Sequence, residues 1–281
     1  MHRAPPPSAP RRAIVTRPER DATQWVVHLH ARGIDAVALP LIAIRGCAHP
    51  EARAALQAAR EAWPRWRAVM FVSSNAAHYF FDPPGTGAAL FAGDPAALPR
   101  IWAPGPGTAQ ALRQAGVPAE SIDRPAPDAA QFDSESLWAQ VAPQVRHGDR
   151  ILVVRGAQAD ADADGADTVA GTGREWLAQQ IAAAGGQAEF VAAYERGAPD
   201  FSAEQLALAR AAATDGSLWL FSSSEAVAHL DAALPGQNWS GARALATHPR
   251  IAQAAQDAGF GAVRQCRPAL NDVVASIESH P

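Results

Sequence analysis

The sequence predicts an α/β protein of two similar domains, each with a parallel sheet flanked by helices. Short apolar segments alternate with longer segments of helical periodicity along the chain, which is typical of parallel strands joined by covering helices. The segment FVSSNA at residues 71–76 returns as FSSSEA at 221–226. Likewise, PGTAQA at 106–111 returns as PRIAQA at 249–254. Because 281 residues are more than one core usually organises, this repetition indicates two domains of similar fold.

The first elements are expected to form a βαβ unit. Residues 13–16 are an apolar strand, and Pro18 suits the first turn of a helix that reaches about Arg32. Gly33 ends this helix, and residues 36–39 form the second strand. Residues 41–45 are then expected to be extended and to lead out of the unit.

The rest of the chain continues the same alternation. Further strands are expected at residues 68–72, 101–103, 151–154, 189–193, 218–221 and 242–246. Helices are expected at residues 51–63, 108–115, 134–145, 174–184, 202–213, 225–233, 251–258 and 271–279. Two long loops, 81–100 and 157–173, interrupt this order. The second contains an acidic run without the glycine and terminal glutamate of a calcium-binding loop, so we interpret it as a mobile, solvated insertion.

Composition excludes several classes of protein. A net charge of −4 and a pI near 6.1 argue against a nucleic-acid-binding protein, which needs a basic surface. Cys47 and Cys266 form no paired-cysteine motif, which predicts no metal site and favours a reducing cytoplasm. Residues 1–11 are Pro-rich and read as a disordered tail. No segment has the roughly 18 apolar residues of a membrane helix, so we expect no membrane contact. We also expect the protein to be a cytoplasmic monomer.

The repeated loops favour an anionic ligand. Each loop joins an apolar strand to a helix, so unsatisfied N–H groups at the helix N-terminus and nearby hydroxyls would meet the ligand. If the two domains face one another, these loops line a central cleft. A nucleotide site at Gly105 is disfavoured, because Gln110 stands where the third glycine of the GxGxxG pattern belongs.

A series of short motifs, taken in order, resembles the uroporphyrinogen-III synthase family. Each motif is weak alone, but the series covers nearly the whole chain from Ala13 onward. The motifs are TRP at 16–18, FVSSNA at 71–76, RG at 155–156, GREWL at 173–177, YER at 194–196, SSS at 222–224 and HPRIA at 248–252, together with residues 103–116 and 133–137.

The resemblance implies a cofactor-free lyase of tetrapyrrole (haem) biosynthesis that closes linear hydroxymethylbilane into a ring while inverting its last pyrrole. It also implies handover of this substrate from the preceding pathway enzyme. The family fold implies one discontinuous domain, residues 12–40 plus 197–281, and a second domain, residues 45–190. Two linker strands, 41–44 and 191–196, would join them.

Tyr194 is the predicted catalytic acid. Departure of the terminal hydroxyl leaves an electrophilic azafulvene that a pyrrole attacks readily, so the enzyme supplies mainly orientation and modest acid help. A phenol is protonated near neutral pH and can donate to that hydroxyl. Tyr194 matches the tyrosine of the family's linker segment. The alternative is a packed tyrosine with its hydroxyl satisfied.

Five arginines compete for the substrate's carboxylates, because a guanidinium offers a planar fork that suits them. Three of them, Arg17, Arg155 and Arg250, lie just after predicted strands, at the edge where open α/β sheets bind ligands. The alternative for each is a surface arginine or a local ion pair. The five are Arg17, Arg155, Arg174, Arg196 and Arg250.

The remaining predicted substrate-binding residues belong to the loops before helices, where their alternative role is helix capping or a tight turn. They are Ser73, Ser74, Asn75, Gly105, Thr108, Gly156, Ser222, Ser223, Ser224 and His248.

Two departures from the family pattern are the long acidic segment 157–173 and the Pro-rich residues 1–11. The first puts in question whether Arg155 and Arg174 reach one site. The alternative function is a two-domain binding protein or sensor for a small polyanion, since function does not follow from fold. Such a protein would not need Tyr194.

Overall fold

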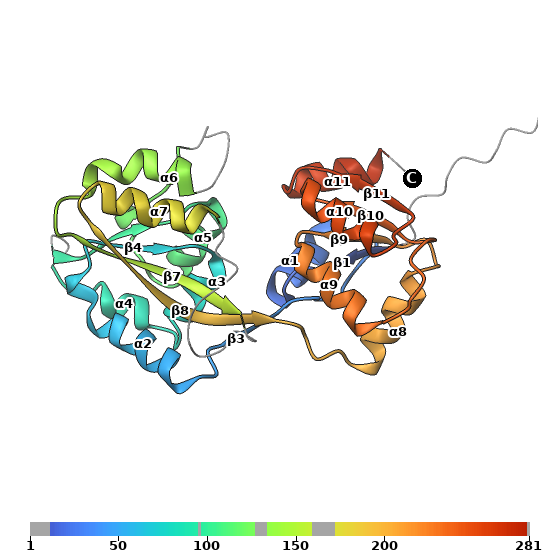
Figure 1. The fold of residues 1–281 in the computed structure, drawn as a ribbon, viewed down its shortest axis with the longest axis horizontal. Helices are drawn as coiled ribbons and strands as arrows, with labels where there is room; N and C mark the ends of the chain where they lie inside the picture. The colour runs from blue at the N-terminus through green and yellow to red at the C-terminus, as the bar shows by residue number, and fades with distance from the viewer. Residues whose placement is uncertain (1–11, 95–96, 127–133, 159–171, 280–281) are drawn as a thin grey trace, which may run out of the picture. The chain divides into compact units, whose positions relative to one another are not determined.

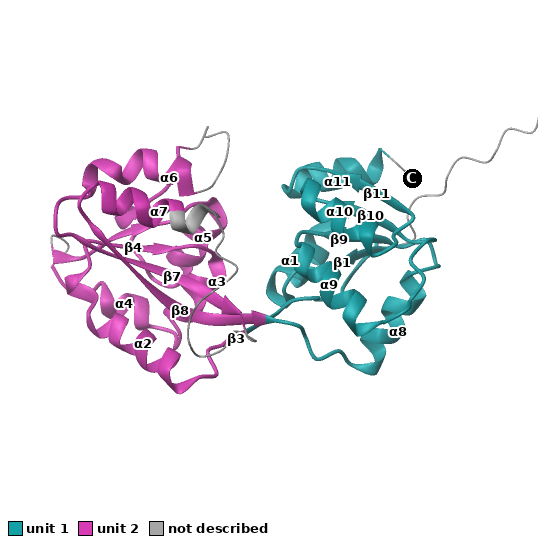
Figure 2. Cartoon of the chain, viewed as in Figure 1, with its two compact units in different colours: residues 1–44, 197–281 teal, residues 45–196 magenta. Residues whose placement is uncertain are grey.

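The chain divides into two compact units in a computed structural model that describes residues 12–94, 97–126, 134–158 and 172–279 (Figure 1). Unit 1 comprises Met1–Ile44 and Gly197–Pro281, and unit 2 comprises Arg45–Arg196 (Figure 2). The predicted disordered tail 1–11 and most of the predicted acidic insertion, residues 159–171, lie outside the described residues. Each unit is described below by itself.

Unit 1 is an open parallel sheet with helices on both faces. Its sheet order is β11-β10-β9-β1-β2, and every neighbouring pair is parallel. One face packs against α1 and α11, and the other against α8, α9 and α10. The elements are β1 (Ala13–Val15), α1 (Glu19–His30), β2 (Ala36–Ala38), α8 (Ala203–Ala212), β9 (Leu218–Phe221), α9 (Ser224–Ala233), β10 (Arg243–Ala246), α10 (Pro249–Asp257), β11 (Ala262–Gln265) and α11 (Leu270–Glu278).

Unit 2 is also an open sheet with helices on both faces, with the order β3-β8-β7-β4-β5-β6, in which the neighbouring pairs from β8 to β6 are parallel. The helices α6 and α7 cover one face of the sheet, and α2 and α4 cover the other (Figure 1). The elements are β3 (Ala43–Gly46), α2 (Pro50–Glu61), η1 (Trp63–Arg65), β4 (Ala68–Phe71), α3 (Ser74–Phe80), α4 (Thr86–Leu90), β5 (Arg100–Trp102), α5 (Pro106–Gln114), η3 (Ala119–Ser121), β6 (Ile122–Asp123), α6 (Ser134–Val141), η4 (Ala142–Gln144), β7 (Arg150–Gln158), α7 (Thr172–Ala183) and β8 (Gln187–Gly197).

The two sheets share one strand order, because β6-β5-β4-β7-β8 corresponds to β11-β10-β9-β1-β2. In unit 2 the chain runs from β4 outward to β6 and then returns to β7. In unit 1 it enters at β1 and β2 and adds β9, β10 and β11 last, so unit 1 is circularly permuted relative to unit 2. The direction of winding reverses between β4 and β7 and between β9 and β1. Open α/β sheets bind ligands at the carboxyl end of such a switch point.

The central strands form because their residues are apolar on both faces. All four residues of β4 are buried, and three of the four in β9. In unit 1, Trp219 packs edge-on against Trp239 at 5.4 Å and stacks on Phe221 at 5.9 Å. In unit 2, Phe71 packs against Phe80 at 5.3 Å. These aromatic cores hold the carboxyl ends of β9 and β4 in place.

The predicted α/β class with parallel sheets flanked by helices is confirmed. The α1 helix ends before Gly33, whose φ of 74° suits glycine. No helix in the described part of the chain combines the length and apolar character needed to cross a membrane.

The structure differs from the sequence predictions mainly at the sheet edges. The strands β6 and β11 were not expected, because β11 is largely exposed and β6 is only two residues long. The predicted loop 81–100 contains α4, and β7 runs on to Gln158. The predicted helix 134–145 gives way after Val141 to a 3-10 turn that contains Pro143. Proline cannot donate the amide that a continuing α-helix needs.

The segments predicted as linker strands belong to larger elements. Residues 191–196 are the second half of β8, which pairs with β7 along its length through Arg196. Of residues 41–44, only Ala43 and Ile44 lie in a strand, at the start of β3. Leu41 is fully buried in the core of unit 1.

Candidate functional site

Tyr194 owes its position to an irregularity between β7 and β8. Arg155 pairs with Ala192, but the next residue, Gly156, pairs with Tyr194. Ala193 is therefore an extra residue in β8, a β-bulge, which re-aims the side chains that follow it. The bulge sets Tyr194 directly across from Gly156, beyond the last residue of β4.

Gly156 makes room for the tyrosine ring. A Cβ atom at Gly156 would lie 2.5 Å from Cε2 and Cζ of Tyr194 and 2.9 Å from its hydroxyl. Side chains do not approach so closely, so any residue other than glycine would displace the ring. The sequence predicted Gly156 as a substrate-binding residue, and its observed contact is with Tyr194.

The Tyr194 hydroxyl lies 3.2 Å from Oγ of Ser73, and either atom can be the donor. The ring stacks on Tyr79, with 5.9 Å between centroids, and the residue is 7% exposed. Ser73 is also the N-cap of α3, because its Oγ accepts a hydrogen bond from the amide of Ala76 at 3.1 Å. The predicted capping role of Ser73 therefore coexists with a contact to Tyr194.

The other predicted residues of unit 2 lie near the same carboxyl edge or behind it. Ser74 and Asn75 begin α3 and are half-buried, and Gly105 precedes α5 in an extended conformation. Thr108 is only 7% exposed, which leaves its side chain little surface for a ligand. Arg155 lies over the Phe190 ring, with Cζ 5.8 Å from the centroid.

Two further predicted arginines lie in β8 and at the start of α7. Arg196 pairs in register with Gln158 at the end of β8, and its side chain is half-buried. Arg174 lies in the first turn of α7, and only its backbone is described.

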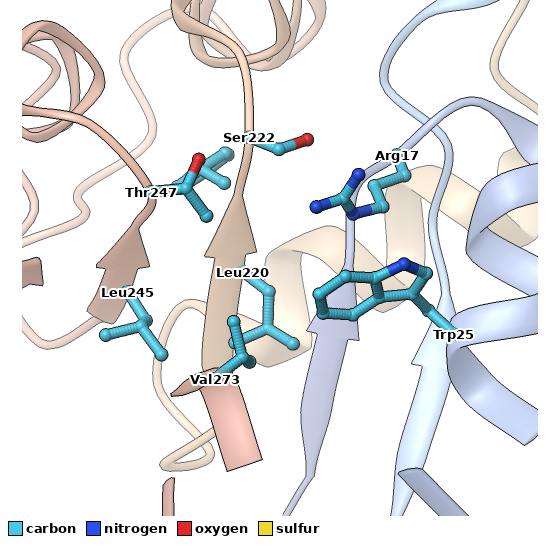
Figure 3. A pocket seen from close by; sticks show the side chains of 8 residues that line it. Arg17, Trp25, Leu220, Ser222, Leu245, Thr247 and Val273 are labelled. Carbon is cyan, nitrogen blue, oxygen red and sulfur yellow. The ribbon is translucent and has the colours of Figure 1, made fainter. Parts of the chain in front are cut away.

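A pocket opens at the switch point of unit 1 (Figure 3). The guanidinium of Arg17 lies above the indole of Trp25, with Cζ 4.1 Å from the ring centroid. Burial lowers the pKa of Arg17, and the nearby Asp21 partly opposes this shift. Ser222 and Thr247 follow β9 and β10 and line the same pocket.

Arg17 and Arg155 occupy equivalent positions in the two sheets. Ala13 pairs with Leu218 in unit 1, and Ile151 pairs with Ala68 in unit 2. Counting four residues along β1 and β7 from these pairs reaches Arg17 and Arg155. Both therefore emerge from the strand that flanks the switch point.

The second set of repeated loops begins α9 and α10. Oγ of Ser223 caps α9 by accepting from the amide of Glu225 at 3.2 Å. Nδ1 of His248 caps α10 by accepting from the amide of Arg250 at 3.2 Å. Ser224, His248 and Arg250 are exposed. Their capping role is observed, and contact with a ligand stays a prediction.

Of the predicted residues, the structure brings Tyr194, Ser73 and Gly156 together in unit 2. In unit 1 it brings Arg17 and Ser222 together at one pocket. Sequence reasoning missed Tyr79, Trp25 and Thr247. Tyr79 and Tyr194 are the only two tyrosines in the sequence, and this rarity could have identified Tyr79 as a candidate. Trp25 and Thr247 line the same pocket as Arg17 because α1 and β10 pack beside the end of β9. No local sequence pattern indicates that packing. The described residues contain no cluster of three or more His, Cys, Asp or Glu side chains that could hold a metal ion.

The fold and these sites define a class: a duplicated α/β protein whose strand-to-helix loops present hydroxyls, amides and arginines at the carboxyl edge of each sheet. The model of the family described as uroporphyrinogen-III synthase HemD matches residues 23–275. The chain belongs to this family, so it is an enzyme of haem biosynthesis, and its function is that of uroporphyrinogen-III synthase.

The chain is also similar to solved structures of uroporphyrinogen-III synthases. A mutant uroporphyrinogen III synthase from the extremely thermophilic bacterium Thermus thermophilus is 17% identical, with a TM-score of 0.49 over 95% of this chain and 97% of that one. Uroporphyrinogen-III synthetase from Helicobacter pylori is 14% identical, with a TM-score of 0.49 over 95% of this chain and 99% of that one.

Proposed function

We propose that this chain closes hydroxymethylbilane to uroporphyrinogen III with loss of water and inversion of the terminal pyrrole, and that Tyr194 is its general acid. Family membership supports the substrate and product. The observation that supports the acid is the Tyr194 hydroxyl, held 3.2 Å from Oγ of Ser73 in a space that only glycine at 156 leaves open.

The proposed first step breaks the bond between carbon and the terminal hydroxyl. The Tyr194 phenol donates its proton to that oxygen, which leaves as water, and the substrate becomes a cationic azafulvene that keeps its pyrrole N–H. The Ser73 hydroxyl then donates to the phenolate oxygen, because that oxygen no longer has a proton to donate, while Oγ of Ser73 still accepts from the amide of Ala76. A hydrogen bond to the charged form stabilises it.

The second step forms the new carbon–carbon bond. The substituted α carbon of the last pyrrole attacks the cationic azafulvene, and the bond from this carbon to the preceding methylene bridge then breaks. The freed bridge carbon bonds to the unsubstituted α carbon of the same ring, which inverts the ring, and the proton that this carbon loses returns to the Tyr194 phenolate. The sum is loss of one water with no change in oxidation level, so the reaction is that of a lyase and needs no redox cofactor. What the protein must supply is the choice of attacking carbon, which depends on how the substrate is held.

The remaining predicted residues are proposed to hold the substrate's carboxylates through guanidinium groups, hydroxyls and free amides. These are Arg17, Ser73, Ser74, Asn75, Gly105, Thr108, Gly156, Arg155, Arg174, Arg196, Ser222, Ser223, Ser224, His248 and Arg250. No observation favours the alternative of a non-catalytic sensor. The monomeric state, the cytoplasmic location and the handover from the preceding enzyme stay predictions.

The test is the identity of the ring that forms. Hydroxymethylbilane generated in the assay closes without an enzyme to the unrearranged isomer, so that reaction is the control. We expect the full chain to give the inverted isomer III faster than the spontaneous closure. Formation of isomer I alone, at the spontaneous rate, would contradict the proposal.

A further inference from the structure

The pocket at the switch point of unit 1 has no assigned occupant. We propose that it is a binding subsite for one carboxylate on a short alkyl arm, formed by Arg17 on Trp25 together with Ser222 and Thr247. The inference rests on the proposed function, because it assigns this pocket to one side arm of the same substrate. It adds Trp25 and Thr247 to the binding residues and gives the pocket a defined chemistry.

The first argument is that Arg17 is a desolvated cation whose guanidinium forms no hydrogen bond or ion pair within the described part of the chain. Burial lowers its pKa, and Asp21 acts on it only from a distance. A cation removed from water without a partner is unfavourable. A carboxylate in the pocket would supply the missing partner through a charge-assisted pair.

The second argument is that the guanidinium is held ready. Trp25 contacts one face of it at 4.1 Å, an arrangement that orients arginine while leaving its edge N–H groups available. Those nitrogens point toward the side of the pocket where Ser222 and Thr247 stand (Figure 3). The Ser222 hydroxyl therefore lies on the side where a carboxylate would meet Arg17, and Thr247 lines the pocket beyond it, at the end of the neighbouring strand (Figure 3).

The carboxyl end of β9 is itself held firmly in place. The hydroxyl of Thr16 donates to the carbonyl of Leu220 at 2.7 Å, inside the core, and so fixes the end of β1 against β9. Arg17 and Ser222 each lie just beyond this hydrogen bond. The subsite is thus built on strand ends rather than on a free loop.

The third argument is size and lining. The pocket is small, with about 210 Å³ of empty space that includes open solvent, so it offers room for one terminal group and not for a whole small molecule. Leu220, Leu245 and Val273 line it opposite the polar groups (Figure 3). Polar groups at one side and an apolar wall suit a carboxylate with one or two methylene groups.

The experiment uses propionate as the probe and the full chain. The eight tryptophans each give an indole N–H signal in a proton–nitrogen NMR spectrum, and Trp25→Phe identifies the signal of Trp25. We expect propionate, but not equal chloride, to shift that signal in a saturable way. Arg17→Gln should abolish the shift. Arg264→Gln, which removes the same charge from exposed β11 of the same unit, should leave it unchanged.

Kinetics then connect the subsite to the substrate. Loss of one charge-assisted contact is expected to raise KM about 10- to 100-fold in Arg17→Gln, with kcat within about threefold. A Trp25 signal that does not respond to propionate, or responds equally in Arg17→Gln, would overturn the subsite. An unchanged KM would overturn its use by the substrate. A propionate response that depends on Arg17 in a chain without ring-closing activity would instead contradict only the proposed function.

Discussion

The two switch points show how one duplicated scaffold acquired two different sites. In unit 1, β1 ends at Val15 and α1 begins at Glu19, so the strand stops and Arg17 is left beside an open pocket. In unit 2, β7 continues past the equivalent Arg155 to Gln158 and stays paired with β8. The strand β7 therefore runs five residues past Val153, the position equivalent to Val15, and a held tyrosine stands where unit 1 has an open pocket.

The bulge explains why the added strand matters. If the register of Arg155 and Ala192 continued without the bulge, Gly156 would pair with Ala193, and Tyr194 would point to the other side of the sheet. The extension and the bulge together bring a hydroxyl to the end of β4, where unit 1 has only Ser222 at the end of β9. Under the proposals made above, unit 1 would bind charge and unit 2 would move a proton.

The largest effect is expected for the proposed acid of unit 2, Tyr194. Tyr194→Phe keeps the ring that packs on Tyr79 and against Gly156 but removes the hydroxyl. Turnover should fall about 10- to 1,000-fold, the range for one general acid or less, and the residual product should still be isomer III. KM should barely change, because the carboxylate contacts remain.

Thermal melting of Tyr194→Phe is the control for folding. Wild-type turnover in this variant would remove Tyr194 from the mechanism and leave orientation as the source of catalysis. A large loss of melting temperature together with activity would favour the packing role of the tyrosine.

The second prediction concerns the glycine that unit 2 requires for this tyrosine. Gly156→Ala would bring a methyl group to 2.5 Å from the Tyr194 ring, so the ring must move. We expect turnover to fall about 10- to 100-fold, as for a displaced catalytic group, and stability to fall by about 1–3 kcal/mol through overpacking. Gly93→Ala, whose added carbon would meet Leu98 at an ordinary 3.9 Å, is the matched control.

A double-variant cycle separates positioning from folding. In the Tyr194→Phe background the ring is still present, so Gly156→Ala should again lower the melting temperature. It should lower turnover little further, because the hydroxyl is already absent. Equal loss of turnover in both backgrounds would show that Gly156 acts independently of Tyr194.

The smallest effect comes from the two capping serines, which the duplication places in equivalent turns. Ser73→Ala and Ser223→Ala each remove an N-cap and should cost about 0.5–2 kcal/mol of stability, measured by denaturant unfolding. Only Ser73 also contacts the Tyr194 hydroxyl. Ser73→Ala should therefore lower kcat about 2- to 10-fold, while Ser223→Ala, which removes only a proposed carboxylate contact, should change KM and keep the wild-type kcat. Equal kcat values in the two variants would remove Ser73 from the proposed acid pair.

Local patterns were sufficient for much of the fold. The buried strands β4 and β9 were visible as apolar runs, and the repeated turns marked the starts of α3 and α9, because strands buried on both faces and capped helices leave short-range signals. The edge strands β6 and β11 were not predicted, because they bury too little surface to require an apolar sequence pattern. The duplication of the scaffold was likewise present in the sequence, while the circular permutation of unit 1 became visible only from strand order.

What the sequence by itself determined is the α/β class, the repeat, the family and the types of residue at the strand ends. Only the tertiary structure decided which of them act together. Tyr194 meets Ser73 and Gly156 because a bulge shifts the register of β8 by one residue. Arg17 lies over Trp25 and shares a pocket with Ser222 and Thr247 because three separate elements converge on β9. The physical reason is that strand pairing and helix packing join residues far apart in the chain, and a single-residue shift of register reverses which side chains meet.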